Sequence, residues 1–235
     1  MTRIVYTLLL LYTIWFAWET RTIAHPPPSM IGLELPTTEA EFRGVLHSED
    51  ATRQRSAIED ARTNLRMDNA FKFLYPLALI VFAWNLYRRN VRRPRIAFGI
   101  AVVTTAICIA TGVFDGLENS RLLDNLQRVT DTSATLALDT MREASLLKWG
   151  LLGLALLLLS LLEMDTTLSA ETASGWTSFR VCVNALAGSA GVLGAVWMQR
   201  ALFEVEVLGF TAVSIAVLLE SWRRGKAGAA SIPPR

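Results

Sequence analysis

Histidine and cysteine are scarce in this chain, with two of each among 235 residues. His25 and His47 both precede the second apolar block, so no histidine pair can hold haem or copper within the membrane. Cys108 and Cys182 lie in or beside apolar blocks and lack the C-x-x-C spacing of a metal site. We therefore expect no metal, no cofactor and no structural disulfide, and thiols that pack as small apolar groups.

A strong charge of either sign is also missing. The 23 lysines and arginines nearly balance the 21 aspartates and glutamates, which leaves a formal net charge of +2. Such a balance gives no reason to expect a nucleic acid or another polyanion as a partner.

Apolar residues make up 52% of the chain, and they form continuous blocks with the charges in the gaps. Blocks of roughly 20 apolar residues can cross a bilayer as helices. The sequence therefore predicts an all-α, polytopic transmembrane helical bundle of about six spans, surrounded by the lipid bilayer. The first block could be a signal peptide, but it lacks a small-x-small cleavage site, so we expect a retained anchor. The expected spans are residues 4–18, 71–87, 96–114, 146–162, 179–198 and 202–222.

Arginine sets the expected orientation. Several arginines lie in the gap between the second and third blocks, and Arg223, Arg224 and Lys226 follow the last block. Short loops rich in Arg and Lys stay in the cytoplasm. We therefore expect a multi-pass protein of the bacterial cytoplasmic (inner) membrane with both termini in the cytoplasm. Residues 19–70 and 115–145 would then lie outside, and the tryptophans near the span ends fit these boundaries.

Both outside segments continue the helical pattern of the neighbouring spans. Thr38 and Glu41 have the spacing of a capping box. Apolar residues then recur at helical spacing towards the second span, after the third span and before the fourth. The sequence thus predicts helices that run past the membrane into an extracytoplasmic helical bundle. Residues 1–163 would form one four-span domain that includes these extensions.

Residues 164–235 are predicted to form a separate two-span helical hairpin with a basic cytoplasmic tail. Ala187, Gly191 and Ala195 repeat at intervals of four, the small-x-x-x-small pattern that lets helices approach closely in lipid. Residues 179–198 could pack against other helices of the same chain. They could also mediate a homo-oligomer or the contact with a partner in a membrane complex.

The main polar constellation lies at the outer end of the third span. Asp115, Glu118 and Asn119 fall at i, i+3 and i+4, so they share one face of a helix. Charges this close to lipid are costly unless they are paired or face a cavity. The neighbouring helices carry polar groups at the same depth. The full candidate set is Asp68, Asn69, Lys72, Asp115, Glu118, Asn119, Arg121 and Lys148.

Three interpretations of this set stay open. It could be a structural network in which Lys72 and Lys148 neutralise Asp115 and Glu118. It could instead be a pocket for a lipid headgroup, a cation or a small ligand. A catalytic carboxylate pair is the third possibility, but no nucleophile, histidine or phosphate loop accompanies it. Glu206, at the start of the last span, is expected to be solvated.

The D-x-x-E-N pattern of residues 115–119 follows an apolar span. The preceding span opens with Asp68-Asn69-Ala70-Phe71 and contains Tyr75. In these features the chain is similar to an uncharacterised group of bacterial four-span membrane proteins. The resemblance covers residues 1–163, and the last hairpin departs from it. It implies a four-span fold and no particular activity.

These observations favour a non-enzymatic membrane protein that acts in assembly or sensing. It would serve as an accessory subunit of a membrane complex or as an extracytoplasmic input module. A small oligomeric transporter or channel is the alternative, although mid-membrane charge is missing from the predicted spans. A membrane-embedded lipid-modifying enzyme that uses the boundary carboxylates is a second alternative. No catalytic residue is assigned.

Overall fold

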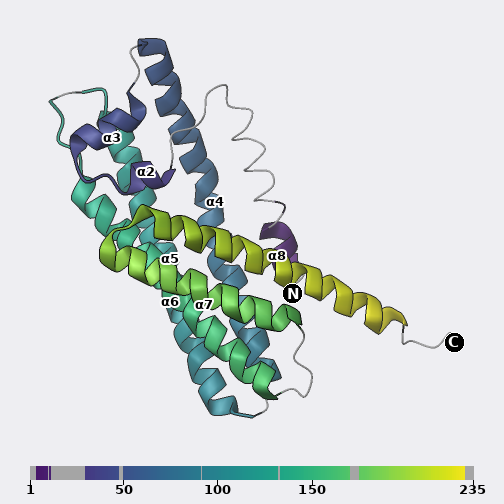
Figure 1. Ribbon diagram of the computed structural model, residues 1–235. Coiled ribbons are helices and arrows are strands. Elements are labelled where there is room, and N and C mark those ends of the chain that lie inside the picture. The colour runs from purple at the N-terminus through teal and green to yellow at the C-terminus, as the bar shows by residue number, and fades with distance from the viewer. Residues whose placement is uncertain are drawn as a thin grey trace.

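Helices are the only regular elements in the described part of the chain, which confirms the predicted all-α fold class. The computed structural model describes residues 4–9, 11, 30–47, 50–90, 92–131, 133–169 and 175–230. In chain order its helices are α2 (Met30–Glu34), α3 (Glu39–Leu46), α4 (Ala51–Arg89), α5 (Pro94–Arg128), α6 (Leu138–Ser169), α7 (Gly175–Trp197) and α8 (Arg200–Ala230) (Figure 1).

Five of these helices, α4 to α8, are long and apolar enough to cross a membrane, which makes the chain a multi-pass membrane protein. The first predicted span is described only in part. Residues 4–9 are helical, and the Tyr6 hydroxyl donates a hydrogen bond to the Ala78 carbonyl oxygen of α4 at 3.2 Å. The rest of that span, apart from residue 11, lies outside the described residues, as does His25.

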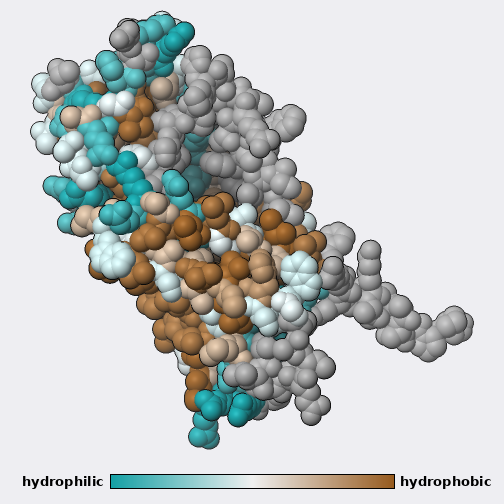
Figure 2. Space-filling model, in the orientation of Figure 1, coloured by the Kyte–Doolittle hydropathy of each residue, from teal (hydrophilic) through white to brown (hydrophobic). Residues whose placement is uncertain are grey.

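The two faces of α5 show why these helices need a lipid environment. The outward face carries large apolar side chains at helical spacing, including Val102, Ile109 and Val113, and each is more than 40% exposed. The inward face is small or polar and includes Ala101 and Thr104. A soluble protein would bury the first face and expose the second. Figure 2 shows the same arrangement, an apolar belt between two hydrophilic ends.

The ends of α4, α5 and α6 beyond this belt pack through their apolar faces with α2 and α3 into a second core, here called the distal bundle. The backbone N–H of Glu41 donates to the Thr38 hydroxyl at 3.1 Å and so fixes the start of α3, as the capping-box spacing predicts. The Glu41 carboxylate accepts from the backbone N–H of Thr37 at 2.8 Å. The core consists of Leu33, Phe42, Leu46, Ile58, Ala61, Leu65, Leu122, Leu126, Val129, Leu136 and Met141.

The small residues of α7 pack within the chain. A Cβ placed on Gly188 would lie 2.6 Å from the Gly153 carbonyl oxygen of α6, so the two backbones touch. Ala195 faces Gly150 of α6, while Ala187 faces Gly209 of α8. The predicted packing pattern therefore joins α7 to both neighbouring helices. In Figure 1, α7 and α8 cross α4, α5 and α6 obliquely.

The connections at the two ends of the bundle differ in charge. The α4–α5 turn exposes its arginines, and buried Asn90 ties this turn to α6 by donating to Asp165 Oδ2 at 2.6 Å. At the opposite end, the short α7–α8 turn contains Met198, whose φ of 54° is in the left-handed region. Arg200, just beyond, donates to the Leu35 carbonyl oxygen at 2.8 Å and pairs with Glu41. This turn is thereby attached to the distal bundle.

Candidate functional site

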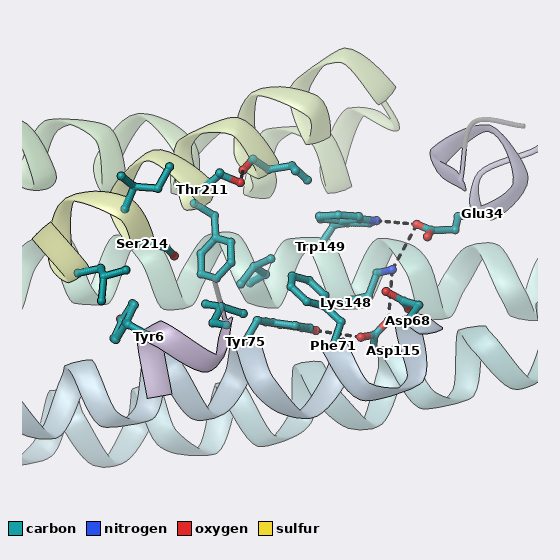
Figure 3. A pocket seen from close by; sticks show the side chains of 16 residues that line it. Tyr6, Glu34, Asp68, Phe71, Tyr75, Asp115, Lys148, Trp149, Thr211 and Ser214 are labelled. Carbon is teal, nitrogen blue, oxygen red and sulfur yellow. Dashed lines mark hydrogen bonds and ion pairs between the residues drawn. The ribbon is translucent and has the colours of Figure 1, made fainter. Parts of the chain in front are cut away.

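A cavity of about 270 Å³ lies where the distal bundle meets the membrane-spanning helices. Its walls come from the first helical stretch and from α2, α4, α5, α6 and α8, so it unites segments far apart in the sequence. Charged side chains gather at one end, and apolar side chains surround the rest (Figure 3). The lining residues are Tyr6, Leu9, Glu34, Asp68, Phe71, Tyr75, Asp115, Lys148, Trp149, Leu152, Val207, Phe210, Thr211, Ser214, Ile215 and Leu218.

The charged end is organised around Lys148 of α6. Its ammonium nitrogen lies 2.7 Å from Glu118 Oε2, 3.2 Å from Glu34 Oε2 and 3.5 Å from Asp115 Oδ1. All four of these side chains are buried, and Glu118 is completely so. The Glu118 contact is an ion pair whose geometry is not that of a hydrogen bond. Together with Asp68, these residues are called the Lys148 cluster.

Helical periodicity explains how α4 and α5 supply their carboxylates. Asp115, Glu118 and Asn119 lie on the buried face of α5. The Asn119 amide donates to Asp68 Oδ2 of α4 at 2.9 Å. Asp68, Phe71 and Tyr75 of α4 are spaced at i, i+3 and i+7 and all line the cavity.

Aromatic side chains complete the polar end. The Tyr75 hydroxyl donates to Asp115 Oδ2 at 3.3 Å, and the Trp149 indole N–H donates to Glu34 Oε2 at 3.2 Å. Lys148 Nζ also lies 4.6 Å from the centre of the Trp149 ring, close enough for a cation–π interaction. Charge and aromatic surface therefore meet at the same point.

The α8 wall makes up much of the apolar part. Val207, Phe210, Ile215 and Leu218 line it, and Thr211 adds a hydroxyl that is already bonded to the Val207 carbonyl oxygen at 2.8 Å. Val207 and Ile215 are also about 40% exposed at the molecular surface. Val207 and Ile215 therefore place the α8 side of the cavity at the molecular surface.

Three of the predicted site residues lie away from this cluster. Lys72 does not neutralise Asp115 or Glu118; it is half-buried and donates to the exposed Asn69 Oδ1 at 2.7 Å. Its long stem lets the ammonium reach the polar edge of the helix. Arg121 is exposed, because it lies outside the buried stripe of α5, and it pairs with Asp124 at 4.0 Å.

Two carboxylates behave differently from what their sequence positions suggest. Glu34 comes from the short helix α2, and no periodic pattern connects it to Lys148 more than 100 residues later. Glu206 is completely buried, so the expectation that it is solvated is wrong. Because the α7–α8 turn is short, the start of α8 packs against α7. The Glu206 carboxylate occupies the space that is free because Gly191 has no Cβ.

A second buried ionic group, here called the Arg180 cluster, lies towards the other end of the spans. Arg180 of α7 donates to Glu163 Oε1 of α6 through Nε at 2.7 Å and pairs with Glu220 of α8. The Arg180 and Glu163 side chains are 4% and 1% exposed. None of these three residues lines the cavity. These ion pairs therefore connect α6, α7 and α8.

No protein-family model matches the chain, and no curated protein or solved structure matches it either.

Proposed function

We propose that this chain is a non-enzymatic membrane protein that binds an amphipathic small molecule and reports its presence to the distal bundle. It would act as an input module or as an accessory subunit of a membrane complex. The observation that carries the proposal is the cavity itself, which has charged residues at one end and apolar residues along the rest. An amphipathic ligand has the same division of polarity.

The distal bundle has a direct connection to this cavity. Glu34 belongs to α2 of the distal bundle, yet its carboxylate contacts both Lys148 and Trp149 of α6. The Ser145 hydroxyl of α6 also donates to the Glu34 carbonyl oxygen at 3.4 Å. A ligand that changes the contacts of Lys148 would therefore change how α2 is held, which is the physical requirement for a signal between the two sites.

The orientation of the chain in the membrane is proposed as well. We infer that the distal bundle lies outside the cytoplasmic membrane of a bacterium and that the exposed arginines of the α4–α5 turn lie inside, because Arg-rich short loops are retained in the cytoplasm. Thr130→Cys and Arg92→Cys replace exposed residues at the two ends. On intact spheroplasts, a membrane-impermeant maleimide should label Thr130→Cys above the parent protein and label Arg92→Cys only after lysis. The reverse pattern would invert the topology.

Ligand binding is tested by native mass spectrometry of the chain extracted from its own membranes into a mild detergent. A bound amphipathic molecule should appear as a reproducible mass increment. Ser214→Phe places a ring in the cavity and should remove the increment, whereas Ser189→Phe makes the same change at an exposed position on α7 and should keep it. A protein without any increment, or one that Ser214→Phe leaves unchanged, would overturn the binding proposal.

Communication between the cavity and the distal bundle can be measured separately. Hydrogen exchange of residues 30–46 should be faster in Ser214→Phe than in Ser189→Phe, because loss of the ligand would loosen the contacts of Glu34. Equal exchange in the two variants, with the mass increment lost only in Ser214→Phe, would mean that binding occurs without communication to the distal bundle.

A further inference from the structure

We propose that the ligand of this cavity carries a positively charged headgroup, an amine or a quaternary ammonium, on a single apolar chain. This inference rests on the proposed function, since it names the chemical class of the molecule that the cavity would bind. Three features support it: the charged end of the cavity, the aromatic rings beside that end, and the small volume of the cavity.

The charge balance at the polar end favours a cation. Four carboxylates, those of Glu34, Asp68, Asp115 and Glu118, surround Lys148, the single cation that the described residues place in the cluster. Asp68 accepts a hydrogen bond from the neutral Asn119 amide and forms no ion pair within the described part of the chain. An anionic headgroup would meet four acidic side chains and one cation, whereas a cationic headgroup could pair with a carboxylate that Lys148 does not contact.

The headgroup has a defined place beside two of these carboxylates. Asp68 and Asp115 lie next to each other, with Lys148 and Phe71 beside them (Figure 3). The rings of Phe71, Tyr75 and Trp149 line the same end of the cavity. Carboxylates and aromatic faces together are the surroundings that bind alkylammonium groups, through charge and through cation–π attraction. Both features are already used by Lys148, whose ammonium lies over the Trp149 ring.

The remaining volume fits a slender apolar body. At about 270 Å³ the cavity is near the lower limit of small-molecule sites, which is roughly 300 Å³. That volume fits a single alkyl chain better than the two acyl chains of a phospholipid. The chain would lie along Leu152, Phe210 and Leu218, within the membrane-spanning part of the protein.

The test uses three photoreactive probes that share a twelve-carbon chain with a diazirine near its end and differ only in the headgroup. One carries a primary amine, the second a carboxylate and the third a hydroxyl. The full chain is reconstituted in nanodiscs, irradiated with each probe at equal concentration, and digested for mass spectrometry. Labelling of the α8 segment that contains Phe210 is compared with labelling of the exposed α7 residues Leu186 and Val196, which report contact from the surrounding lipid.

The amine probe should label the α8 segment about tenfold more strongly than the other two, since a hydrogen bond to a charged group gives at least that discrimination. Unlabelled dodecylamine should compete. Asp68→Asn with Asp115→Asn should abolish the preference for the amine, while Asp139→Asn, at an exposed carboxylate, should keep it. If the double variant does not fold, the relative labelling of the unmodified chain by the three probes still tests whether a cationic headgroup is preferred.

The outcomes separate this inference from the proposed function. Equal labelling by the amine and the alcohol would mean that the carboxylates do not attract a positively charged headgroup. That result would overturn the inference of a cationic ligand. Preference for the carboxylate probe would overturn it as well. In both cases an amphipathic ligand would still occupy the cavity. Failure of every probe to label the α8 segment above the α7 residues would overturn amphiphile binding altogether.

Discussion

The Lys148 cluster and the Arg180 cluster both bury one cation among carboxylates, but they differ in what surrounds them. Lys148 borders a cavity, and four carboxylates from three other segments of the chain lie around it. Arg180 joins α6, α7 and α8 through two glutamates, and no residue of its group lines the cavity. Burial of charge alone therefore does not identify a binding site. What distinguishes the Lys148 cluster is the cavity beside it.

The two clusters also differ in packing. The Arg180 cluster lies where α6, α7 and α8 meet, and further along the α6–α7 contact the backbones of Gly153 and Gly188 touch. Beside the Lys148 cluster, α8 stands back from α4 and α6, and the cavity separates them. We therefore expect a change in charge or volume to reduce the stability of the chain more at the α6–α7 contact than at the Lys148 cluster. The following variants test this contrast.

The largest effect is expected from Arg180→Gln. The substitution removes the cation beside buried Glu163 and partly buried Glu220, and breaking a buried ion pair typically costs about 3–5 kcal/mol. Unfolding of the purified chain in detergent, followed by circular dichroism, measures the loss. Removal of all three charges, by Arg180→Met with Glu163→Gln and Glu220→Gln, should recover most of it. A single variant that unfolds like the parent protein would show that the cluster contributes nothing to stability.

Lys148→Gln should cost less, about 1–3 kcal/mol, even though more carboxylates surround Lys148 than surround Arg180. Glu34, Asp68 and Asp115 face the cavity, which leaves them room to move apart once the cation is lost, while no residue of the Arg180 cluster lines it. The same unfolding measurement, run in parallel with Arg180→Gln, checks the order. A larger loss for Lys148→Gln than for Arg180→Gln would make the cluster a structural lock and weaken the case for a binding site.

Gly188→Ala tests the close packing directly. Its Cβ would lie 2.6 Å from the Gly153 carbonyl oxygen, and overpacking of this kind costs about 1–3 kcal/mol. Gly99→Ala is the matched control, because a Cβ there meets nothing within 4 Å. The control should be neutral or slightly stabilising, by up to about 1 kcal/mol, because alanine has the higher helix propensity. Equal stability of the two variants would contradict the close approach of α6 and α7.

The smallest effect concerns Glu41 in the distal bundle. Hydrogen bonds from the Thr37 backbone and hydroxyl hold the pKa of the Glu41 carboxyl below its usual value of 4.5. A lowered pKa means that the contribution of Glu41 is present above pH 4.5 and is lost as the pH falls through the lower, folded-state value. Hydrogen exchange of α3, corrected for intrinsic rates, should show this acid loosening in the parent and not in Glu41→Gln. The contribution should stay below about 1 kcal/mol because the carboxylate is partly exposed.

Local periodicity accounts for the parts that the sequence could predict. Apolar blocks gave the helices, because a helix long enough to span lipid is recognisable without its neighbours. The shared face of Asp115 and Glu118 follows from i, i+3 spacing, and the structure brings both to Lys148. The continuation of α4 and α5 beyond the membrane followed from apolar stripes in the same way.

The rest depends on contacts between distant segments. Glu34 lies on a five-residue helix whose position is set by the distal bundle, so no spacing connects it with Lys148. Arg180 and Glu206 are near the ends of apolar blocks, where charges are ordinarily solvated. They are buried because α6, α7 and α8 approach closely, and that approach depends on glycines in helices that pack only in the folded chain.

Structure determination of the chain in nanodiscs formed from its own membranes would show directly whether a ligand occupies the cavity. If the cavity binds a cationic amphiphile, we expect an elongated density in it, with its polar end beside Asp68 and Asp115 and its apolar end beside Phe210 and Leu218. A cavity closed by the chain's own side chains, with Lys148 and its carboxylates in a sealed network, would contradict the account. The Lys148 cluster would then be a structural lock like the Arg180 cluster.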